Sequence, residues 1–140
     1  VDFDELDVLD LFCGTGNISF EFVSRGAQSV TCVDASAKCA AFVKSTFDEL
    51  KFESGTIIKA DALRFVESSK RKWNLIFADP PYSYDQYPNL VDTILENGLL
   101  AEDGILIIEH PEEVDFTSVK QHTQTRNYGR VHFSFFELEA

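Results

Sequence analysis

Several features that define other classes of protein are scarce or missing in this 140-residue sequence. It has three cysteines, Cys13, Cys32 and Cys39, and no Cys-x-x-Cys pair, which argues against a disulfide framework or a zinc site. Its apolar runs are short, such as 105–108, whereas a membrane span needs ~20 apolar residues. We therefore expect a cytoplasmic protein in a reducing environment, with no bound metal ion and no membrane contact.

Positive charge is also in short supply. There are 12 Lys and Arg residues against 24 Asp and Glu residues, which gives a formal net charge of -12. Proteins that bind nucleic acid usually carry a basic surface, so this balance argues against an extended RNA or DNA contact made by this segment alone. No basic flank precedes an apolar run at the start, so a signal peptide is not expected. Because the sequence does not begin with Met, we expect it to be a piece of a longer protein.

What the sequence does contain is a regular alternation of short apolar segments and helical patterns. Strands are expected at 8–12, 30–33, 56–59, 73–78 and 105–108, and helices at 18–24, 38–50, 62–68 and 89–97. Strands that are apolar on both faces are typical of a parallel sheet covered by helices. This pattern predicts one doubly wound α/β domain, and the length suits a single core.

The end of the chain follows a different pattern. Residues 122–126 and 131–136 alternate in polarity, a turn is expected at 128–130, and no helix separates the two segments. They are therefore expected to form an antiparallel hairpin. Five parallel strands followed by a terminal hairpin resemble the layout of class I methyltransferases, which are Rossmann-like. That resemblance implies that the last strand of the chain is inserted between the fifth and the sixth.

A glycine-rich loop, 12–17, follows the first expected strand. Glycine lets the backbone turn sharply and approach a ligand without a Cβ in the way. In open α/β sheets, ligands lie at the carboxyl ends of the strands, which is where this loop is expected. The alternative is a turn that binds nothing. Against NAD, Ser19 stands where the dinucleotide fingerprint has its third glycine.

Two acidic residues end neighbouring strands of the predicted sheet. Asp34 ends the second strand, where its carboxylate can accept hydrogen bonds from ribose hydroxyls. Alternatively, Asp34 or Ser36 caps the helix that follows. Asp61 ends the third strand and could bind an adenine amino group, although helix capping explains it equally well. The glycine loop and Asp34 together favour a nucleoside-containing cofactor.

The motif Asp79-Pro80-Pro81-Tyr82 ends the fourth expected strand. It suits methyl transfer to a poorly nucleophilic NH2 group, which must be held with its lone pair in line with the methyl group. The Asp79 carboxylate and the Pro80 carbonyl can each accept one N–H and stabilise the developing positive charge. The prolines fix the backbone, and Tyr82 offers a flat face for a base turned out of its helix. The alternative is a strand-ending turn with a capping Asp.

Taken together, these residues resemble a known family. The motif at 79–82 and the loop at 10–17 are similar to those of methyltransferases that act on the amino group of adenine, guanine N2 or a glutamine amide. The stretch 10–27, which ends in Ser-Arg-Gly-Ala, resembles the first motif of the RsmD-type family of 16S rRNA guanine-N2 methyltransferases. The resemblance covers 6–138.

The resemblance implies S-adenosylmethionine as the cofactor and assigns residues to two sites. The cofactor would be bound by Asp10, Phe12, Cys13, Gly14, Thr15, Gly16, Asn17, Asp34, Ala35, Asp61 and Ala62, and the target guanine by Asp79, Pro80, Pro81 and Tyr82. Cys13 and Asn17 depart from the family, which usually has small residues there. The family also carries a basic N-terminal segment that this chain begins too late to contain, and its absence would account for the acidic charge.

The resemblance thus predicts a monomeric enzyme that methylates the N2 amino group of a guanine in 16S rRNA or the small ribosomal subunit. The nearest alternative is the same chemistry on adenine N6 or a glutamine amide. A second alternative, an NAD-dependent dehydrogenase, has no use for the motif at 79–82. A third, a non-catalytic binding module, is disfavoured by the intact Gly14, Gly16, Asp34 and Asp79.

Four further residues are candidates for substrate contact. Arg126 and Arg130 flank the last expected turn and could bind phosphate if the sixth strand is parallel to the others, or could simply protect a hairpin tip from edge pairing. Tyr84 and Tyr87 could form a lid over the base or pack on the helix at 89–97. His110 follows the fifth strand and is expected to be structural, because methyl transfer to an amine needs no earlier proton acceptor.

Overall fold

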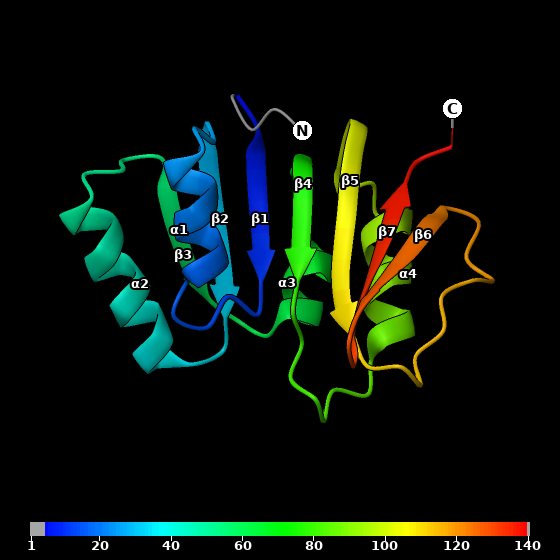
Figure 1. The fold of residues 1–140 in the computed structure, drawn as a ribbon. Coiled ribbons are helices and arrows are strands. Elements are labelled where there is room, and N and C mark those ends of the chain that lie inside the picture. The colour runs from blue at the N-terminus through cyan, green and yellow to red at the C-terminus, as the bar shows by residue number, and fades with distance from the viewer. Residues whose placement is uncertain (1–4, 140) are drawn as a thin grey trace.

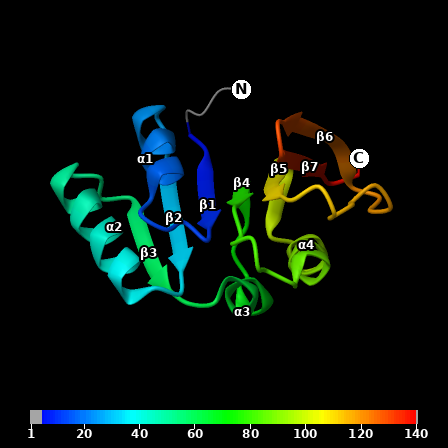
Figure 2. The ribbon, with the colours of Figure 1, turned by 60° about the horizontal axis from the view of Figure 1, so that its bottom comes forward.

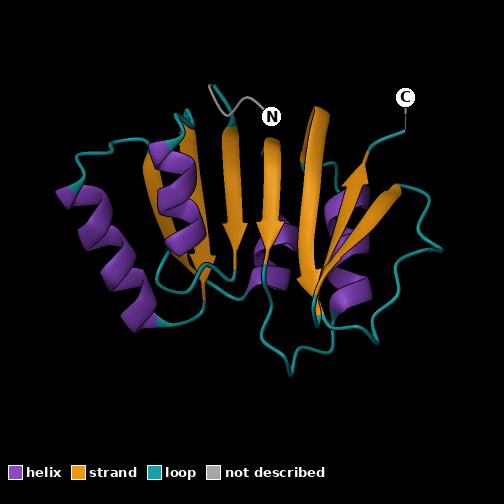
Figure 3. Cartoon of the chain, in the orientation of Figure 1, coloured by secondary structure: helices purple, strands orange, loops and turns teal. Residues whose placement is uncertain are grey.

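The computed structural model describes residues 5–139, which form one seven-stranded sheet with helices on both faces (Figure 1; Figure 3). The strands are β1 (Asp7–Leu11), β2 (Ser29–Asp34), β3 (Gly55–Lys59), β4 (Trp73–Ala78), β5 (Leu100–His110), β6 (His122–Tyr128) and β7 (Val131–Glu137). The helices are α1 (Asn17–Ser24), α2 (Ala37–Glu49), α3 (Ala62–Ser68) and α4 (Tyr87–Glu96).

The strand order is β3-β2-β1-β4-β5-β7-β6, as the resemblance to class I methyltransferases implied. The first five strands pair in parallel, and β7 pairs antiparallel with both β5 and β6. Two antiparallel steps in succession restore the original direction, so β6 runs parallel to the first five strands. The predicted doubly wound sheet with a terminal hairpin is therefore confirmed.

The fifth strand begins earlier than the sequence pattern indicated. Leu100 pairs with Trp73, and the register then shifts before Leu75 pairs with Ile105. The intervening polar residues contain Asp103, whose φ is 63°, and this irregularity breaks the alternation that would have marked a strand. Gly104 is needed here because a Cβ would lie 2.8 Å from the carbonyl oxygen of Ala101.

The two faces of the sheet carry separate cores. One core packs strand residues such as Val8 and Val30 against α1 and α2, through Phe22 and Phe47. The other packs the alternate residues of the same strands against α3 and α4, and Leu9, Leu11, Ile76, Val66, Leu90 and Ile94 belong to it. Successive side chains of a strand point to opposite faces, which is why apolar residues at consecutive positions are needed. Figure 2 shows α3 and α4 on the face opposite α1 and α2.

The carboxyl ends of the parallel strands meet along one edge of the sheet, at the bottom of Figure 1. The loops after β1, β2, β3, β4 and β5 all leave from this edge. Because β6 is parallel to these strands, the β6–β7 turn lies on the same edge. The topology therefore brings together residues from six separate parts of the sequence. No described helix is long and apolar enough to cross a membrane.

Candidate active site

The loop after β1 uses its two glycines for different reasons. Gly16 has a φ of 88°, and a Cβ there would lie 2.9 Å from the ring of Phe20 and 3.2 Å from Val43. Gly14 has a φ of 56°, yet a Cβ would meet no described atom within 4 Å. Gly16 thus packs the loop against α1 and α2, while Gly14 leaves open space beside the chain, as a backbone that receives a ligand must.

Asp34 holds this loop against the end of β2. Its Oδ2 accepts a hydrogen bond from the backbone N–H of Gly14 at 2.8 Å, and its Oδ1 accepts one from the N–H of Ser36 at 2.9 Å. The N-cap of α2 is Ser36, whose hydroxyl accepts from the N–H of Cys39. Each carboxylate oxygen has a second lone pair, so Asp34 keeps acceptor capacity for ribose hydroxyls.

Asp10 lies beneath the loop, with only 2% of its surface exposed. Its Oδ2 accepts a hydrogen bond of 2.6 Å from the hydroxyl of Ser19 in α1. Burial raises the pKa of the Asp10 carboxyl to about 7, and the nearby charges of Asp79 and Asp34 add to the shift, while the Ser19 hydrogen bond opposes it. Asp10 therefore anchors the start of α1.

A cavity lies next to this loop at the carboxyl edge. It is lined by Phe12, Val33, Asp34, Ala35, Ser36, Ala60, Asp61, Ala62, Asp79 and Pro81. Five of the residues assigned to the cofactor from the sequence are thus brought together here: Phe12, Asp34, Ala35, Asp61 and Ala62. The other six, Asp10, Cys13, Gly14, Thr15, Gly16 and Asn17, do not line this cavity.

The donor and acceptor set of this cavity fits a nucleoside. Apolar walls from Phe12, Val33 and Ala62 suit a flat ring, and Asp34 and Asp61 supply acceptors at the ends of β2 and β3. Asp61 also caps α3, because its Oδ2 accepts from the N–H of Arg64 at 3.1 Å. The capping interpretation of Asp61 is therefore correct, and the carboxylate still faces the cavity.

Tyr84 packs beside the same cavity. Its ring meets the edge of Phe12 at 5.0 Å and of Tyr87 at 5.4 Å, between ring centroids. Its hydroxyl is buried without a hydrogen-bond partner among the described residues. Burial, and then the charge of Asp61, raises the pKa of Tyr84 to about 12. An unpartnered buried hydroxyl costs roughly 1–3 kcal/mol, so this group fits a cavity that receives a polar ligand.

Of the two interpretations of Tyr84 and Tyr87, a lid over the base or packing against the fold, the structure favours the second. Helix α4 begins at Tyr87, two residues before the predicted start, with Pro88 in its first turn. Tyr87 is consequently buried, with 4% of its surface exposed, and belongs to the core between α4 and the sheet. Both tyrosines therefore pack against the fold, as the second interpretation had it, although Tyr87 also borders the pocket described next.

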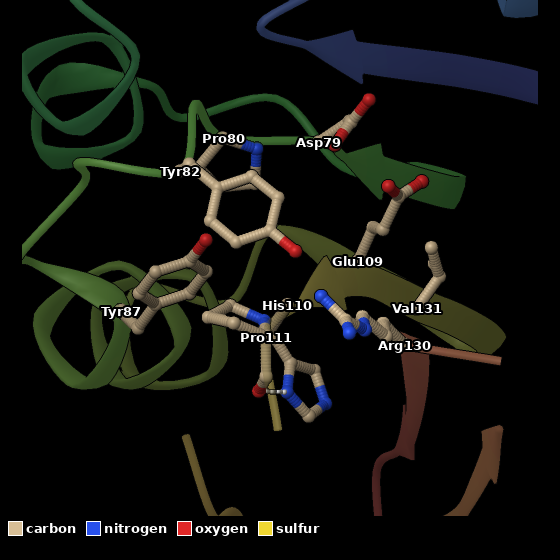
Figure 4. Close-up of a pocket in the computed structure, with 9 residues that line it drawn as sticks. All are labelled: Asp79, Pro80, Tyr82, Tyr87, Glu109, His110, Pro111, Arg130 and Val131. Carbon is tan, nitrogen blue, oxygen red and sulfur yellow. Dashed lines mark hydrogen bonds between the residues drawn. The ribbon is translucent and has the colours of Figure 1, made fainter. Parts of the chain in front are cut away.

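A second pocket, of about 300 Å³, lies on the other side of Asp79 (Figure 4). It is lined by Asp79, Pro80, Tyr82, Tyr87, Glu109, His110, Pro111, Arg130 and Val131. Tyr82 is 78% exposed and forms an open wall, whereas Pro80 is buried. Asp79 and Arg130 were expected near the substrate; Glu109 was not singled out. An acid at the carboxyl end of a strand was the signal that could have found it.

Asp79 and Glu109 form a pair of neighbouring carboxyl groups. Burial raises the pKa of Asp79, while the hydrogen bond to Glu109 lowers it. Burial, the charge of Asp79 and that hydrogen bond all raise the pKa of Glu109. Two adjacent carboxylates repel each other, so the pair keeps a proton to higher pH than a single exposed carboxyl would.

The two arginines predicted to contact substrate have different positions. Arg130 lies in the β6–β7 turn and lines the pocket, which places this turn on the active-site edge. Arg126 lies on β6 and does not line the pocket. Its guanidinium carbon is 5.6 Å from the centroid of the Phe135 ring, and its Nε donates to Gln124. The parallel direction of β6 therefore brings only one of the two arginines to the site.

In its neutral form, His110 has a tautomer defined by its two hydrogen bonds. A carbonyl oxygen can only accept, so Nδ1–H donates to the backbone oxygen of Pro111 at 2.9 Å. Nε2 then accepts from the hydroxyl of Ser134 at 2.7 Å. Burial lowers the pKa of His110. These contacts tie β5 to β7 and agree with a structural role.

The family model described as Conserved hypothetical protein 95 matches residues 2–137 of this sequence. This chain belongs to that family. Its resemblance to the RsmD type is confirmed by relatives such as the ribosomal RNA small subunit methyltransferase D of Buchnera aphidicola, 28% identical over 101 residues. That match covers 72% of this chain and 52% of the relative. YlbH of Bacillus subtilis is 33% identical over 111 residues, which are 76% of this chain and 60% of YlbH.

A solved structure has the same fold. HI0767 of Haemophilus influenzae superposes with a TM-score of 0.88 at 22% identity, over 98% of this chain and 89% of that chain. The agreement supports the class I sheet described above. The chain spans a little over half the length of the two curated relatives named here.

Proposed function

We propose that this chain is the catalytic domain of an S-adenosylmethionine-dependent enzyme that methylates the N2 amino group of a guanine in small-subunit rRNA. The observation that carries the proposal is the position of Asp79, which lines both the cofactor cavity and the second pocket. A group at the junction of two pockets can hold the nitrogen that receives the methyl group close to the methyl donor. When bound, S-adenosylmethionine would supply an electrophilic methyl group on sulfur.

The residues at this junction would orient the amine and stabilise the charge that develops on it. The Asp79 carboxylate accepts one N–H of the target amine, and the Pro80 carbonyl accepts the other. These two bonds direct the nitrogen lone pair toward the cofactor cavity. Asp79 would stabilise the positive charge that develops on the nitrogen when it receives the methyl group. The excess proton then leaves to the carboxyl pair, and Tyr82 stacks on the base.

Two observations support an RNA target: the names of the relatives, and Arg130, the one cationic side chain among the described residues that line the second pocket. The relative from Buchnera is named a small-subunit rRNA methyltransferase, and the family resemblance adds guanine N2. Arg130 stands beside the second pocket, where a base turned out of its helix would enter. The net charge of -12 requires the remaining RNA contacts to come from a small patch or from a further segment.

The cofactor half of the proposal is tested by calorimetric titration with S-adenosylmethionine, with NAD as the control ligand. We expect binding of S-adenosylmethionine alone, weakened at least ~10-fold in Asp34→Ala because a charged hydrogen-bond acceptor for the ribose is lost. Binding of NAD in its place would refute the proposal.

The substrate half is tested with labelled S-adenosylmethionine and small-subunit rRNA that carries no modifications. The RNA is digested to nucleosides, and the labelled product is identified. We expect N2-methylguanosine. Label on adenine N6, or label only on a protein substrate, would instead support the second candidate, the same chemistry on another amino group.

A further inference from the structure

Three polar side chains cross the second pocket in a fixed order. Asp79 follows β4, Glu109 lies on β5, and Arg130 immediately precedes β7 (Figure 4). These strands are consecutive in the sheet, and Ala78 pairs with Ile108, which places Asp79 opposite Glu109. Neighbouring strands are ~4.8 Å apart, which sets the separation of these two residues. Arg130 is not level with them, because Glu109 pairs with Phe133 of β7, but its side chain lines the same pocket from the β6–β7 turn, so Glu109 lies between Asp79 and Arg130 (Figure 4). From Asp79 to Arg130, the three side chains offer two hydrogen-bond acceptors and then a hydrogen-bond donor.

The Watson–Crick edge of guanine has the complementary order. It presents two donors, N2–H and N1–H, followed by the acceptor O6. Adenine presents a donor at N6 followed by an acceptor at N1, and a glutamine amide presents its carbonyl beside the NH2 group. Among these amino-group targets, guanine alone places an N–H next to the amine and a carbonyl beyond it. A lone pair on adenine N1 would instead face the oxygen atoms of Glu109.

We propose that Glu109 and Arg130 select guanine, with Glu109 accepting N1–H and Arg130 donating to O6 while Asp79 holds the N2 amine. This rests on the proposed function and adds a basis for its specificity. No ion pair is formed by Arg130 within residues 5–139, so its donors remain available to the pocket. Glu109 is half-buried, which lets its carboxyl reach the base while limiting competition from water.

The protonation of the carboxyl pair makes this selection depend on pH. Burial, and then the charge of Asp79 and the hydrogen bond between the two carboxyls, raise the pKa of Glu109, so a proton on the pair competes with guanine as pH falls. Guanine N1–H and the Arg130 guanidinium supply donors in place of that proton, so guanine binds the ionised form. Adenine N1 needs a donor and would bind only the protonated form. Burial raises the pKa of Tyr87 to about 12 and lowers that of His110, which favours the uncharged form of both rings.

The first experiment measures methyl transfer to unmodified small-subunit rRNA by Glu109→Ala, Glu109→Gln and Arg130→Ala. Each lost hydrogen bond to a base is expected to reduce kcat/KM roughly 10- to 100-fold. Glu109→Gln keeps the shape of the side chain and one acceptor oxygen. It should therefore fold, and it tests the contact if Glu109→Ala does not fold. Glu112→Gln, an exposed acid three residues along the chain, is the matched control and keeps the wild-type rate.

A second experiment separates recognition of N1–H and O6 from recognition of the amine. Inosine monophosphate has both groups and lacks the amine. We expect it to inhibit wild type, and to inhibit the residual activity of Glu109→Ala and Arg130→Ala at least ~10-fold more weakly. Adenosine monophosphate should inhibit wild type more weakly than inosine monophosphate does.

The outcomes distinguish the two proposals. If wild type labels adenine or no RNA, the proposed function fails and the specificity argument fails with it. If wild type makes N2-methylguanosine and the Glu109 variants match the Glu112→Gln control in rate and in inhibition, only the specificity argument is overturned. Equal inhibition of wild type by the adenosine and inosine monophosphates would also overturn it.

Discussion

An added methyl group should have different consequences at the two glycines of the loop after β1. At Gly16 it should mainly reduce stability, and at Gly14 it should mainly reduce cofactor affinity. In Gly16→Ala the new Cβ would lie 2.9 Å from two ring carbons of Phe20 and 3.2 Å from Val43, at a φ of 88°. The left-handed backbone costs roughly 1–2 kcal/mol and the overpacking roughly 1–3 kcal/mol, so we expect a loss of about 2–5 kcal/mol. In Gly14→Ala only the backbone cost of about 1–2 kcal/mol applies, because no described atom lies within 4 Å.

Thermal and urea unfolding measure this difference directly. For a domain of this size, 1 kcal/mol corresponds to roughly 3–5 °C in Tm, so Gly16→Ala should melt about 10 °C or more below wild type and Gly14→Ala about 5 °C below. The order reverses for ligand binding. The Cβ of Gly14→Ala enters the open space beside the cofactor loop, and we expect at least a ~10-fold loss of S-adenosylmethionine affinity by calorimetry. Gly16→Ala, titrated well below its Tm, should lose less.

The reasoning is refuted if both variants lose the same stability, because the contacts of Gly16 with Phe20 and Val43 would then carry no energy. It is also refuted if Gly14→Ala binds S-adenosylmethionine like wild type, since the space beside Gly14 would then not face the ligand. Substitution of Gly129 in the distant β6–β7 turn is a control for backbone strain alone. Its φ is 65° and a Cβ there meets no described atom within 4 Å, so Gly129→Ala should cost about as much stability as Gly14→Ala and leave cofactor affinity unchanged.

Three further predictions concern charge. The pKa of the Asp10 carboxyl is raised from 3.8 to about 7 in the folded state, so the folded state holds the proton more tightly than the unfolded state does. The contribution of this group to stability therefore falls as pH rises from about 4 through 7. In urea unfolding, the free energy of unfolding should decrease less between pH 5 and pH 8 in Asp10→Asn than in wild type. The raised pKa of Glu109 predicts that kcat/KM for guanine methylation increases with pH through that pKa, and a flat profile in wild type would contradict it. Arg130→Ala should reduce kcat/KM for RNA roughly 10-fold or more, whereas Arg126→Ala, whose guanidinium is occupied by Phe135 and Gln124, should change it less than ~2-fold in the same assay.

Local patterns were sufficient to predict most of the fold. Short apolar or β-branched runs predicted the parallel strands, and the absence of a helix between 122–126 and 131–136 predicted the hairpin. The strand order came from the family resemblance, because a single sequence holds no record of which strands are neighbours. The early start of β5 was missed, since its polar residues and the φ of 63° at Asp103 interrupt the alternation.

The site was predicted in part for similar reasons. Asp34, Asp61 and Asp79 lie at or just beyond the ends of strands, and strand ends meet at one edge, so their convergence could be expected. Glu109 was missed because an acid at a strand end is common, and only the pairing of Ala78 with Ile108 places it opposite Asp79. The burial of Tyr84 and Tyr87 and the separation of Arg126 from Arg130 depend on side-chain packing, which spacing along the chain does not determine.

Because β7 is inserted between β5 and β6, one strand of the hairpin packs in the core and the other is exposed. β7 closes the core with Phe136 and Ser134, both fully buried, whereas every residue of β6 after His122 is exposed. Changes of length or sequence in β6 and in the turn it feeds should therefore cost little stability. Arg130 belongs to this tolerant segment, while the cofactor cavity is built from buried strand ends. Within such a fold, the part that meets the substrate can diverge while the part that binds the methyl donor stays fixed.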